Sequence, residues 1–253
     1  MSDTAPFISH LLELRNRLMR AVAVWIIASA FCYIYAEDIY RFLVQPLADA
    51  FAGENRRLIA TSLTETFVTY LKLAVYGGFF LAFPYIAAEV YLFISPGLYR
   101  KERGVILPYI VAAPVLFIMG AALAYYFVMP KAWAFFISFE SPHLGEGLPL
   151  VLETKVSEYL SLAMQIVLAF GLSFQLPVVL TLLVRVGLLS AQQLASGRRY
   201  MIVILATIAA FITPPDILSQ ILLLIPLYTL YELSILVCKA IERRRVTEEP
   251  EHA

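Results

Sequence analysis

The sequence predicts an all-α, polytopic membrane protein with six transmembrane helices, both termini cytoplasmic, and a concave bundle in which the fifth and sixth spans are short. Hydrophobic residues occupy 61% of the 253 positions and the mean hydropathy is +0.79, well above the roughly half-apolar composition of soluble domains. Apolar stretches recur six times along the chain. They run approximately over residues 21–35, 67–94, 105–128, 156–184, 200–212 and 217–237.

The basic residues predict the orientation. An even number of spans places both termini on one side, and 13 of the 19 Lys and Arg fall on that side, which the positive-inside rule makes cytoplasmic. The N-terminus lacks a short apolar core followed by a small-residue cleavage site, so we expect the first span to be a retained anchor. We expect one membrane domain over residues 1–238 and a charged, disordered cytoplasmic tail over 239–253.

An amphipathic helix is expected over about residues 6–20, leading into the first span. Its polar arc and its apolar arc lie on opposite sides of a helical wheel, as in an interfacial helix. The polar arc contains His10, Glu13, Asn16, Arg17 and Arg20, and the apolar arc contains Phe7, Leu11, Leu14 and Leu18.

Segment lengths and proline positions predict the loops, the helix kinks and the short last hairpin. Two longer segments, 36–66 and 129–155, contain turn-forming Pro or Gly and are expected to be outer loops. Prolines inside or near the spans should kink the helices and make one wall concave. These are Pro84, Pro108, Pro114, Pro177 and Pro226. The run over 200–212 would rise only about 20 Å against a hydrocarbon core of about 30 Å, and Glu232 interrupts the sixth span, so this hairpin must thin the bilayer or be shielded.

Four segments carry a family resemblance. They are HLLELRNRL at 10–18, SPGLYRKER at 95–103, FGLSF at 170–174 and TPPD at 213–216. In this order they resemble the TatC family, the core of the twin-arginine (Sec-independent) protein translocase. The resemblance implies a receptor subunit in the bacterial cytoplasmic (inner) membrane that binds Arg-Arg signal peptides of folded precursors at the cytoplasmic face. It also implies assembly with TatA-like and TatB-like single-span subunits and with further copies of the chain, and transport driven by the proton-motive force.

Glu13 and Glu102 are the strongest candidates for recognition. Both place a carboxylate at the predicted cytoplasmic end of a membrane span, where basic residues are usual. A carboxylate accepts a guanidinium through two parallel hydrogen bonds, which lysine cannot reproduce. The resemblance implies that both dock the signal arginines. From spacing alone, Glu13 equally suits an i,i+4 pair with Arg17, and Glu102 a solvated loop charge.

Three further residues, Arg15, Arg17 and Phe93, belong to this candidate site. Arg15 interrupts the apolar arc, so it either snorkels or pairs with a carboxylate, Glu102 being the obvious one. Phe93 aligns with the recognition region of the family, although packing explains an aromatic residue at an interface equally well.

Intramembrane polar residues form a second candidate set. Six residues of the fourth span fall within an arc of about 100°: Thr154, Ser157, Glu158, Ser161, Gln165 and Gln175. Gln175 stands near the midplane, where the family commonly has glutamate, so we expect hydrogen bonding to a partner or within the bundle instead of proton transfer. Thr213, Asp216 and Gln220 either cap the last hairpin or, as the resemblance implies, contact single-span partners.

Other function classes fit less well. A serine protease would need a histidine near Ser173 inside the membrane, and no histidine is predicted there. The sequence also has no metal-spaced His/Cys cluster and no phosphate-binding loop. We therefore expect no enzyme activity, cofactor, metal or nucleic acid. The stronger alternative is a proton- or ion-coupled small-solute transporter with Glu89, Glu158 and Gln175 meeting in one enclosed site. Cys32 and Cys238 should be roughly 30 Å apart, as buried free thiols.

Overall fold

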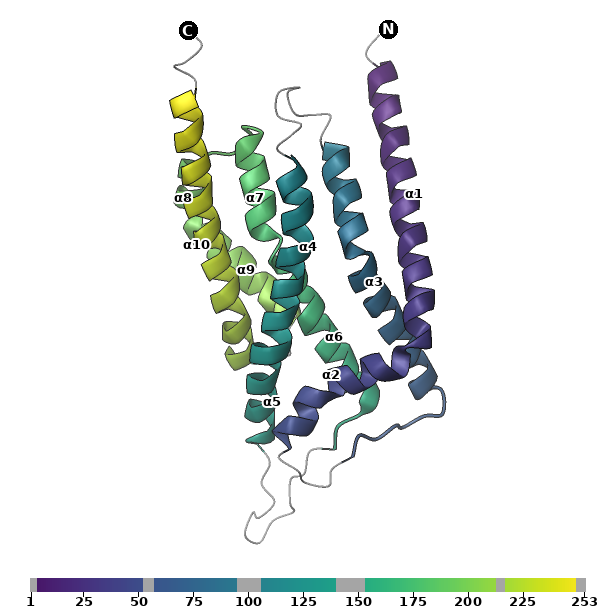
Figure 1. Cartoon of the computed structure of the whole chain (residues 1–253). Helices are drawn as coiled ribbons and strands as arrows, with labels where there is room; N and C mark the ends of the chain where they lie inside the picture. Colours follow the sequence, from purple (N-terminus) through teal and green to yellow (C-terminus); the bar gives the residue numbers. More distant parts are fainter. Residues whose placement is uncertain (1–3, 52–56, 95–105, 140–152, 213–216, 249–253) are drawn as a thin grey trace. The chain divides into compact units, whose positions relative to one another are not determined.

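The computed structural model describes residues 4–51, 57–94, 106–139, 153–212 and 217–248, and these residues are helical with short connections (Figure 1). In the described residues the one β-type pairing is an isolated bridge between Ile59 and Lys155. The helices are α1 Thr4–Ile34, α2 Ala36–Ala50, α3 Glu65–Ile94, α4 Ile106–Leu123, a π-helical turn Ala124–Val128, α5 Met129–Ile137, α6 Val156–Ser173, α7 Leu176–Arg185, α8 Ala191–Ser196, α9 Arg198–Ile212 and α10 Ile217–Glu248.

Five helical segments of the described chain are long and apolar enough to cross a membrane. They are His10–Ile34, Glu65–Phe93, Leu107–Ile137, Val156–Arg185 and Gln220–Arg243. All five fall on predicted apolar runs, which confirms an all-helical, multi-pass membrane protein. Helix α9, which coincides with the predicted fifth span, has 15 residues and rises only about 22 Å.

The chain forms two compact units. The first comprises Met1–Pro114 and Trp133–Met164, and the second Val115–Ala132 and Gln165–Ala253. In the first unit α1 lies along α3 (Figure 1). A Cβ on Gly78 would lie 2.5 Å from the backbone N of Ser29, so the helices approach closely because residue 78 has no side chain. Trp25 Nε1 adds a hydrogen bond to the Val75 carbonyl at 2.9 Å.

Two segments expected to be loops contain helices. Residues 36–66 begin with α2, and residues 129–155 begin with α5, which continues α4 through the π-helical turn. Helix α2 is amphipathic and buries Leu43 and Leu47, and its Leu43 carbonyl accepts a hydrogen bond from Tyr159 at 2.7 Å. The expectation relied on turn-forming residues, and Pro46 lies inside α2 all the same.

Glu65 joins the start of α3 to the start of α6. Its Oε2 accepts hydrogen bonds from the backbone N and the hydroxyl of Thr61, at 2.6 and 3.0 Å. Its Oε1 accepts from the backbone N and the hydroxyl of Ser157, at 3.2 and 2.6 Å. Because helix N-termini expose unsatisfied N–H groups, one carboxylate here satisfies donors from two segments.

In the second unit, the phenylalanine-glycine motif at 170–174 packs closely against α4. A Cβ on Gly120 of α4 would lie 2.5 Å from the Phe170 carbonyl oxygen and 2.8 Å from the Phe174 ring, and a Cβ on Gly171 would lie 2.6 Å from the Phe117 ring. Phe170 and Phe117 are fully buried. The motif recognised in the sequence therefore has a packing role.

Helix α10 extends further than the sequence suggested. We expected a disordered tail from residue 239, but α10 is continuous to Glu248. Glu242 also accepts a hydrogen bond from the Ala191 backbone N at 2.7 Å, at the start of α8. Because the tail continues a packed helix and consists largely of helix-forming Glu, Lys and Arg, its first ten residues stay helical. Cys32 and Cys238 are both free and buried, as expected, and their separation stays a prediction.

Candidate functional site

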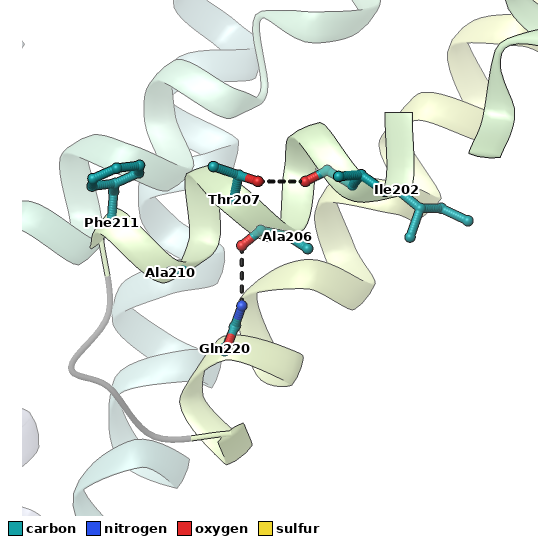
Figure 2. A pocket seen from close by; sticks show the side chains of 7 residues that line it. Ile202, Ala206, Thr207, Ala210, Phe211 and Gln220 are labelled. Carbon is teal, nitrogen blue, oxygen red and sulfur yellow. Dashed lines mark hydrogen bonds between the residues drawn. The ribbon is translucent and has the colours of Figure 1, made fainter. Parts of the chain in front are cut away.

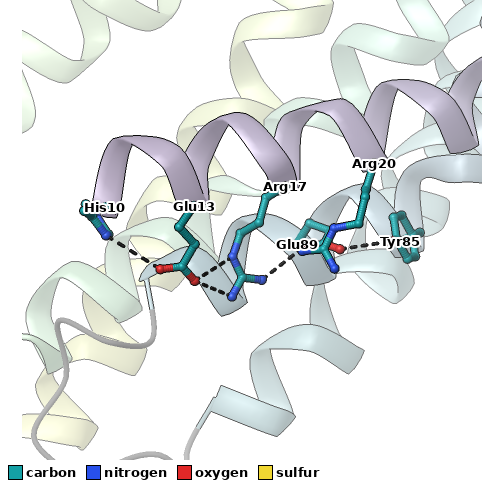
Figure 3. Close-up of polar contacts among 6 residues, drawn as sticks. All are labelled: His10, Glu13, Arg17, Arg20, Tyr85 and Glu89. Carbon is teal, nitrogen blue, oxygen red and sulfur yellow. Dashed lines mark hydrogen bonds and ion pairs between the residues drawn. The ribbon is translucent and has the colours of Figure 1, made fainter. Parts of the chain in front are cut away.

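A polar network joins α1 to the C-terminal part of α3 (Figure 3). His10, Glu13, Arg17 and Arg20 lie on successive turns of one face of α1, as their spacing of three and four residues requires. Tyr85 and Glu89 are one turn apart on α3. The packing of α1 on α3 brings the two groups together.

Arg17 lies at the centre of this network. Its Nε and Nη2 donate to Oε1 of Glu13 at 3.0 and 2.7 Å, and its Nη1 donates to Oε2 of Glu89 at 2.9 Å. Arg20 Nη2 donates to the same Glu89 oxygen at 3.3 Å, and the Tyr85 hydroxyl donates to Oε1 at 2.8 Å. Both oxygens of Glu89 are thus engaged, and its side chain is 9% exposed.

Glu13 is the accessible carboxylate of the pair. Its side chain is 38% exposed, both bonds from Arg17 go to Oε1, and Oε2 lies 4.0 Å from His10 Nδ1. An open groove of about 590 Å³ adjoins it, lined by Leu12, Glu13, Asn16, Arg17 and Arg20. This arrangement can accept a cation, above all a planar guanidinium that matches both carboxylate oxygens.

Three of the five predicted recognition residues lie together. Glu13 pairs with Arg17, and Phe93 stacks on His10 with ring centroids 4.4 Å apart and planes inclined by 16°. Arg15 is exposed and contacts Asn16 Oδ1 at 3.4 Å. Glu102 lies outside the described residues.

Gln220, from the second candidate set, lines a groove formed by α9 and α10 (Figure 2). It measures about 420 Å³ and is lined by Ile202, Val203, Ala206, Thr207, Ala210, Phe211 and Gln220. Gln220 Nε2 donates to the Ala206 carbonyl at 3.1 Å, and the Thr207 hydroxyl donates to the Val203 carbonyl at 2.8 Å. The lining is otherwise apolar and exposed, with Phe211 88% exposed. Thr213 and Asp216 lie outside the described residues.

Residues 9–226 match the family described as Sec-independent protein translocase protein (TatC). The chain belongs to the TatC family. It is 46% identical to the TatC protein of Rickettsia prowazekii over 94% of both chains, and 36% identical to that of Escherichia coli K12 over 93% of this chain and 88% of the relative. A crystal structure of the twin-arginine translocase receptor TatC superposes with a TM-score of 0.80 at 35% identity, covering 91% of this chain and 98% of that one.

Membership of the TatC family does not support the small-solute transporter alternative, and the geometry agrees. Glu158 is exposed and lies 3.3 Å from Lys155, next to Ser157, which binds Glu65 at the start of α3. Glu89 lies 24 residues further along α3, about 36 Å away at 1.5 Å per residue. The two carboxylates therefore do not share an enclosed site. The TatC family is one of translocase receptor components and not of enzymes.

The predicted polar arc of the fourth span is interrupted. Helix α6 ends at Ser173 and α7 begins at Leu176, with Gln175 in the N-cap position and Pro177 in the first turn of α7. Pro177 cannot donate to the carbonyl of residue 173 and its ring clashes there, so one helical wheel does not describe residues 154–175. Gln165 is exposed on α6 and Gln175 is half-buried at the break. Their contact with a partner stays a prediction.

Four members of the network were not predicted as recognition residues: Glu89 and Tyr85 on α3, and His10 and Arg20 on α1. A tyrosine four residues before a glutamate inside an apolar helix is a detectable signal, because a buried carboxylate needs donors. The partner helix that supplies the arginines was not detectable, since Arg17 and Glu89 are 72 residues apart.

Proposed function

We propose that the chain is the receptor and core subunit of a twin-arginine protein export system, and that it binds Arg-Arg signal peptides through Glu13 and Glu102. The observation that carries the proposal is the half-exposed Glu13 carboxylate, which opens onto a groove while the charge of Arg17 is shared with buried Glu89. A signal arginine can therefore reach a carboxylate that is already oriented.

The chemistry favours arginine over lysine. A guanidinium can offer parallel N–H donors to both oxygens of a carboxylate, whereas an ammonium group is a point charge without that fork. Two carboxylates suit two consecutive arginines, and Glu102 supplies the second in this proposal. Arg17 orients Glu13 through two hydrogen bonds, and the Phe93–His10 stack forms an aromatic wall beside it.

The proposal includes the membrane arrangement. Six spans, with α9 as a short fifth span, place both termini in the cytoplasm of a bacterial cell whose inner membrane holds the protein. The distribution of Lys and Arg supports this orientation. Single-span TatA-like and TatB-like subunits would contact Gln220 and the groove beside it, together with Thr213 and Asp216. Glu158, Gln165 and Gln175 are further candidates for contact with these subunits, and copies of the chain assemble in the receptor complex.

The experiment compares binding of a labelled Arg-Arg signal peptide and its Lys-Lys counterpart to purified protein in nanodiscs. We expect Glu13→Gln and Glu102→Gln to weaken Arg-Arg binding about tenfold each, the size of one lost charge-assisted hydrogen bond, and the double variant to abolish the preference over Lys-Lys. Glu37→Gln is the matched control, because Glu37 forms an exposed i,i+4 pair with Arg41 on α2. Parental affinity in the double variant would overturn the proposal.

A further inference from the structure

We propose that Glu89 is a positioning residue for signal recognition: it holds Arg17 and Arg20 so that Glu13 stays available to a guanidinium from outside. The inference rests on the proposed function, and adds a residue that never touches the peptide. Glu89 is buried on α3, at the base of the network, whereas Glu13 lies at the rim on α1.

The geometry divides Arg17 between two acids. Its Nε and Nη2 face Glu13 and its Nη1 faces Glu89. A peptide guanidinium that binds both oxygens of Glu13 must displace at least part of the Arg17 contact with Oε1. Arg17 then keeps its bond to Glu89, so the displaced cation is not left without a partner in a partly buried position, which would be costly.

Charge balance gives the same result. Glu13, Glu89, Arg17 and Arg20 carry two negative and two positive formal charges. Replacing Glu89 by glutamine leaves this cluster with an excess positive charge and leaves Glu13 as the remaining carboxylate for Arg17. An incoming cation would meet repulsion and a more strongly occupied Glu13. Glu89→Gln should therefore weaken peptide binding without removing any peptide contact.

A second site of the same chemistry offers a control. Glu232 on α10 accepts a hydrogen bond from Tyr228, four residues earlier, at 2.8 Å, as Glu89 does from Tyr85. It also accepts two bonds from Arg198 of α9, at 2.7 and 2.9 Å. Glu232 belongs to the second unit and its side chain is 32% exposed. Glu232→Gln therefore removes a more exposed interhelical ion pair of the same chemistry without changing the charge of the network around Glu13.

The test measures affinity for the Arg-Arg and Lys-Lys peptides and the melting temperature of each variant in nanodiscs, at low and high salt. We expect Glu89→Gln to weaken Arg-Arg binding about tenfold, with part of the loss recovered in high salt, since screening reduces repulsion between exposed charges. The double variant Glu89→Gln, Arg20→Gln restores the charge balance and should regain much of the affinity. Glu232→Gln should keep parental affinity.

Arg20→Gln alone keeps the test decisive if Glu89→Gln does not fold. Arg20 is 56% exposed and contacts Glu89 but not Glu13, so its loss is tolerable and gives the network a negative excess, which should strengthen peptide binding. The inference is overturned if Glu89→Gln binds as the parent does, if Arg20→Gln has no effect or weakens binding, or if Glu232→Gln loses as much affinity as Glu89→Gln. Loss of binding in Glu13→Gln alongside any of these results would leave the proposed function standing, whereas an indifferent Glu13→Gln would remove both.

Discussion

Arg15 and Arg17 are two positions apart on α1 and have opposite surroundings. The Arg17 side chain is 18% exposed and donates to two carboxylates, whereas Arg15 is exposed with a single long contact to Asn16. The described residues thus favour a solvated or snorkelling Arg15. The carboxylate first considered for it, Glu102, lies outside them.

Lysine substitutions should separate these two arginines. Arg17→Lys keeps the charge but loses the fork, so it cannot make all three bonds to Glu13 and Glu89. We expect it to destabilise the protein by about 1 kcal/mol, the net value of one hydrogen bond, and to weaken Arg-Arg peptide binding. Arg15→Lys should melt and bind as the parent does. Thermal unfolding in detergent and peptide titration measure both, and equal behaviour of the two variants would contradict this assignment.

The sequence contained only the local half of this network. The pair of Glu13 with Arg17 follows from i,i+4 spacing, and it coexists with the proposed recognition role because both Arg17 bonds use one oxygen. The Glu89 contact depends on how two helices pack. Without that packing, the sequence shows only an isolated intramembrane acid at Glu89, which also suits a transport path.

At the scale of helices, hydropathy predicted the five membrane-length helices but not helix α2 or the break between α6 and α7. Apolar runs mark membrane-length helices irrespective of tertiary contacts. The turn-forming residues of 36–66 favoured a loop, whereas the segment begins with the amphipathic helix α2, which buries Leu43 and Leu47. The α6–α7 break separates Gln175 from the polar residues of α6. Pro177 predicts a kink, and at that kink Gln175 takes the N-cap position of α7.

The close approach of α1 and α3 gives a prediction at this scale. In Gly78→Ala the new methyl would meet the Ser29 backbone at 2.5 Å, and backbone cannot yield without separating the helices. We expect a destabilisation of about 1 to 3 kcal/mol, typical of overpacking. Gly77→Ala is the control, because its nearest neighbour is the side-chain end of Ile39 at 3.1 Å, which can move.

Unfolding of the purified variants in mixed micelles measures the difference. Gly78→Ala should also loosen the Arg17 to Glu89 contact, since those residues lie on the same two helices, and should therefore weaken peptide binding more than Gly77→Ala does. A Gly78→Ala protein as stable as the parent would show that the helices separate without cost.

At the scale of the whole molecule, many large apolar side chains are exposed and could face either lipid or a partner subunit. Lipid can cover apolar side chains, so exposure alone identifies no partner. Helix α9 offers more than exposed apolar side chains, because it is short and lines a groove. The α9 residues of the groove recur at spacings of three and four along one face of the helix, and Gln220 of α10 lies at one edge. A polar side chain beside an apolar groove in a membrane suits a helix that fills the groove and hydrogen-bonds to the amide.

Filling this groove should therefore separate assembly from recognition. Ala206→Phe and Ala210→Phe place a ring in the groove while leaving the Ala206 carbonyl to Gln220. We expect these variants to lose co-purification of the single-span subunits and export of a folded twin-arginine reporter, and to keep parental affinity for the Arg-Arg peptide. Ile204→Phe and Ile208→Phe are the controls, because both positions are exposed on α9, at 52% and 41%, and neither lines the groove. Normal partner recovery in Ala206→Phe and Ala210→Phe would place the contact elsewhere. Loss in all four variants would show instead that α9 as a whole tolerates no added bulk.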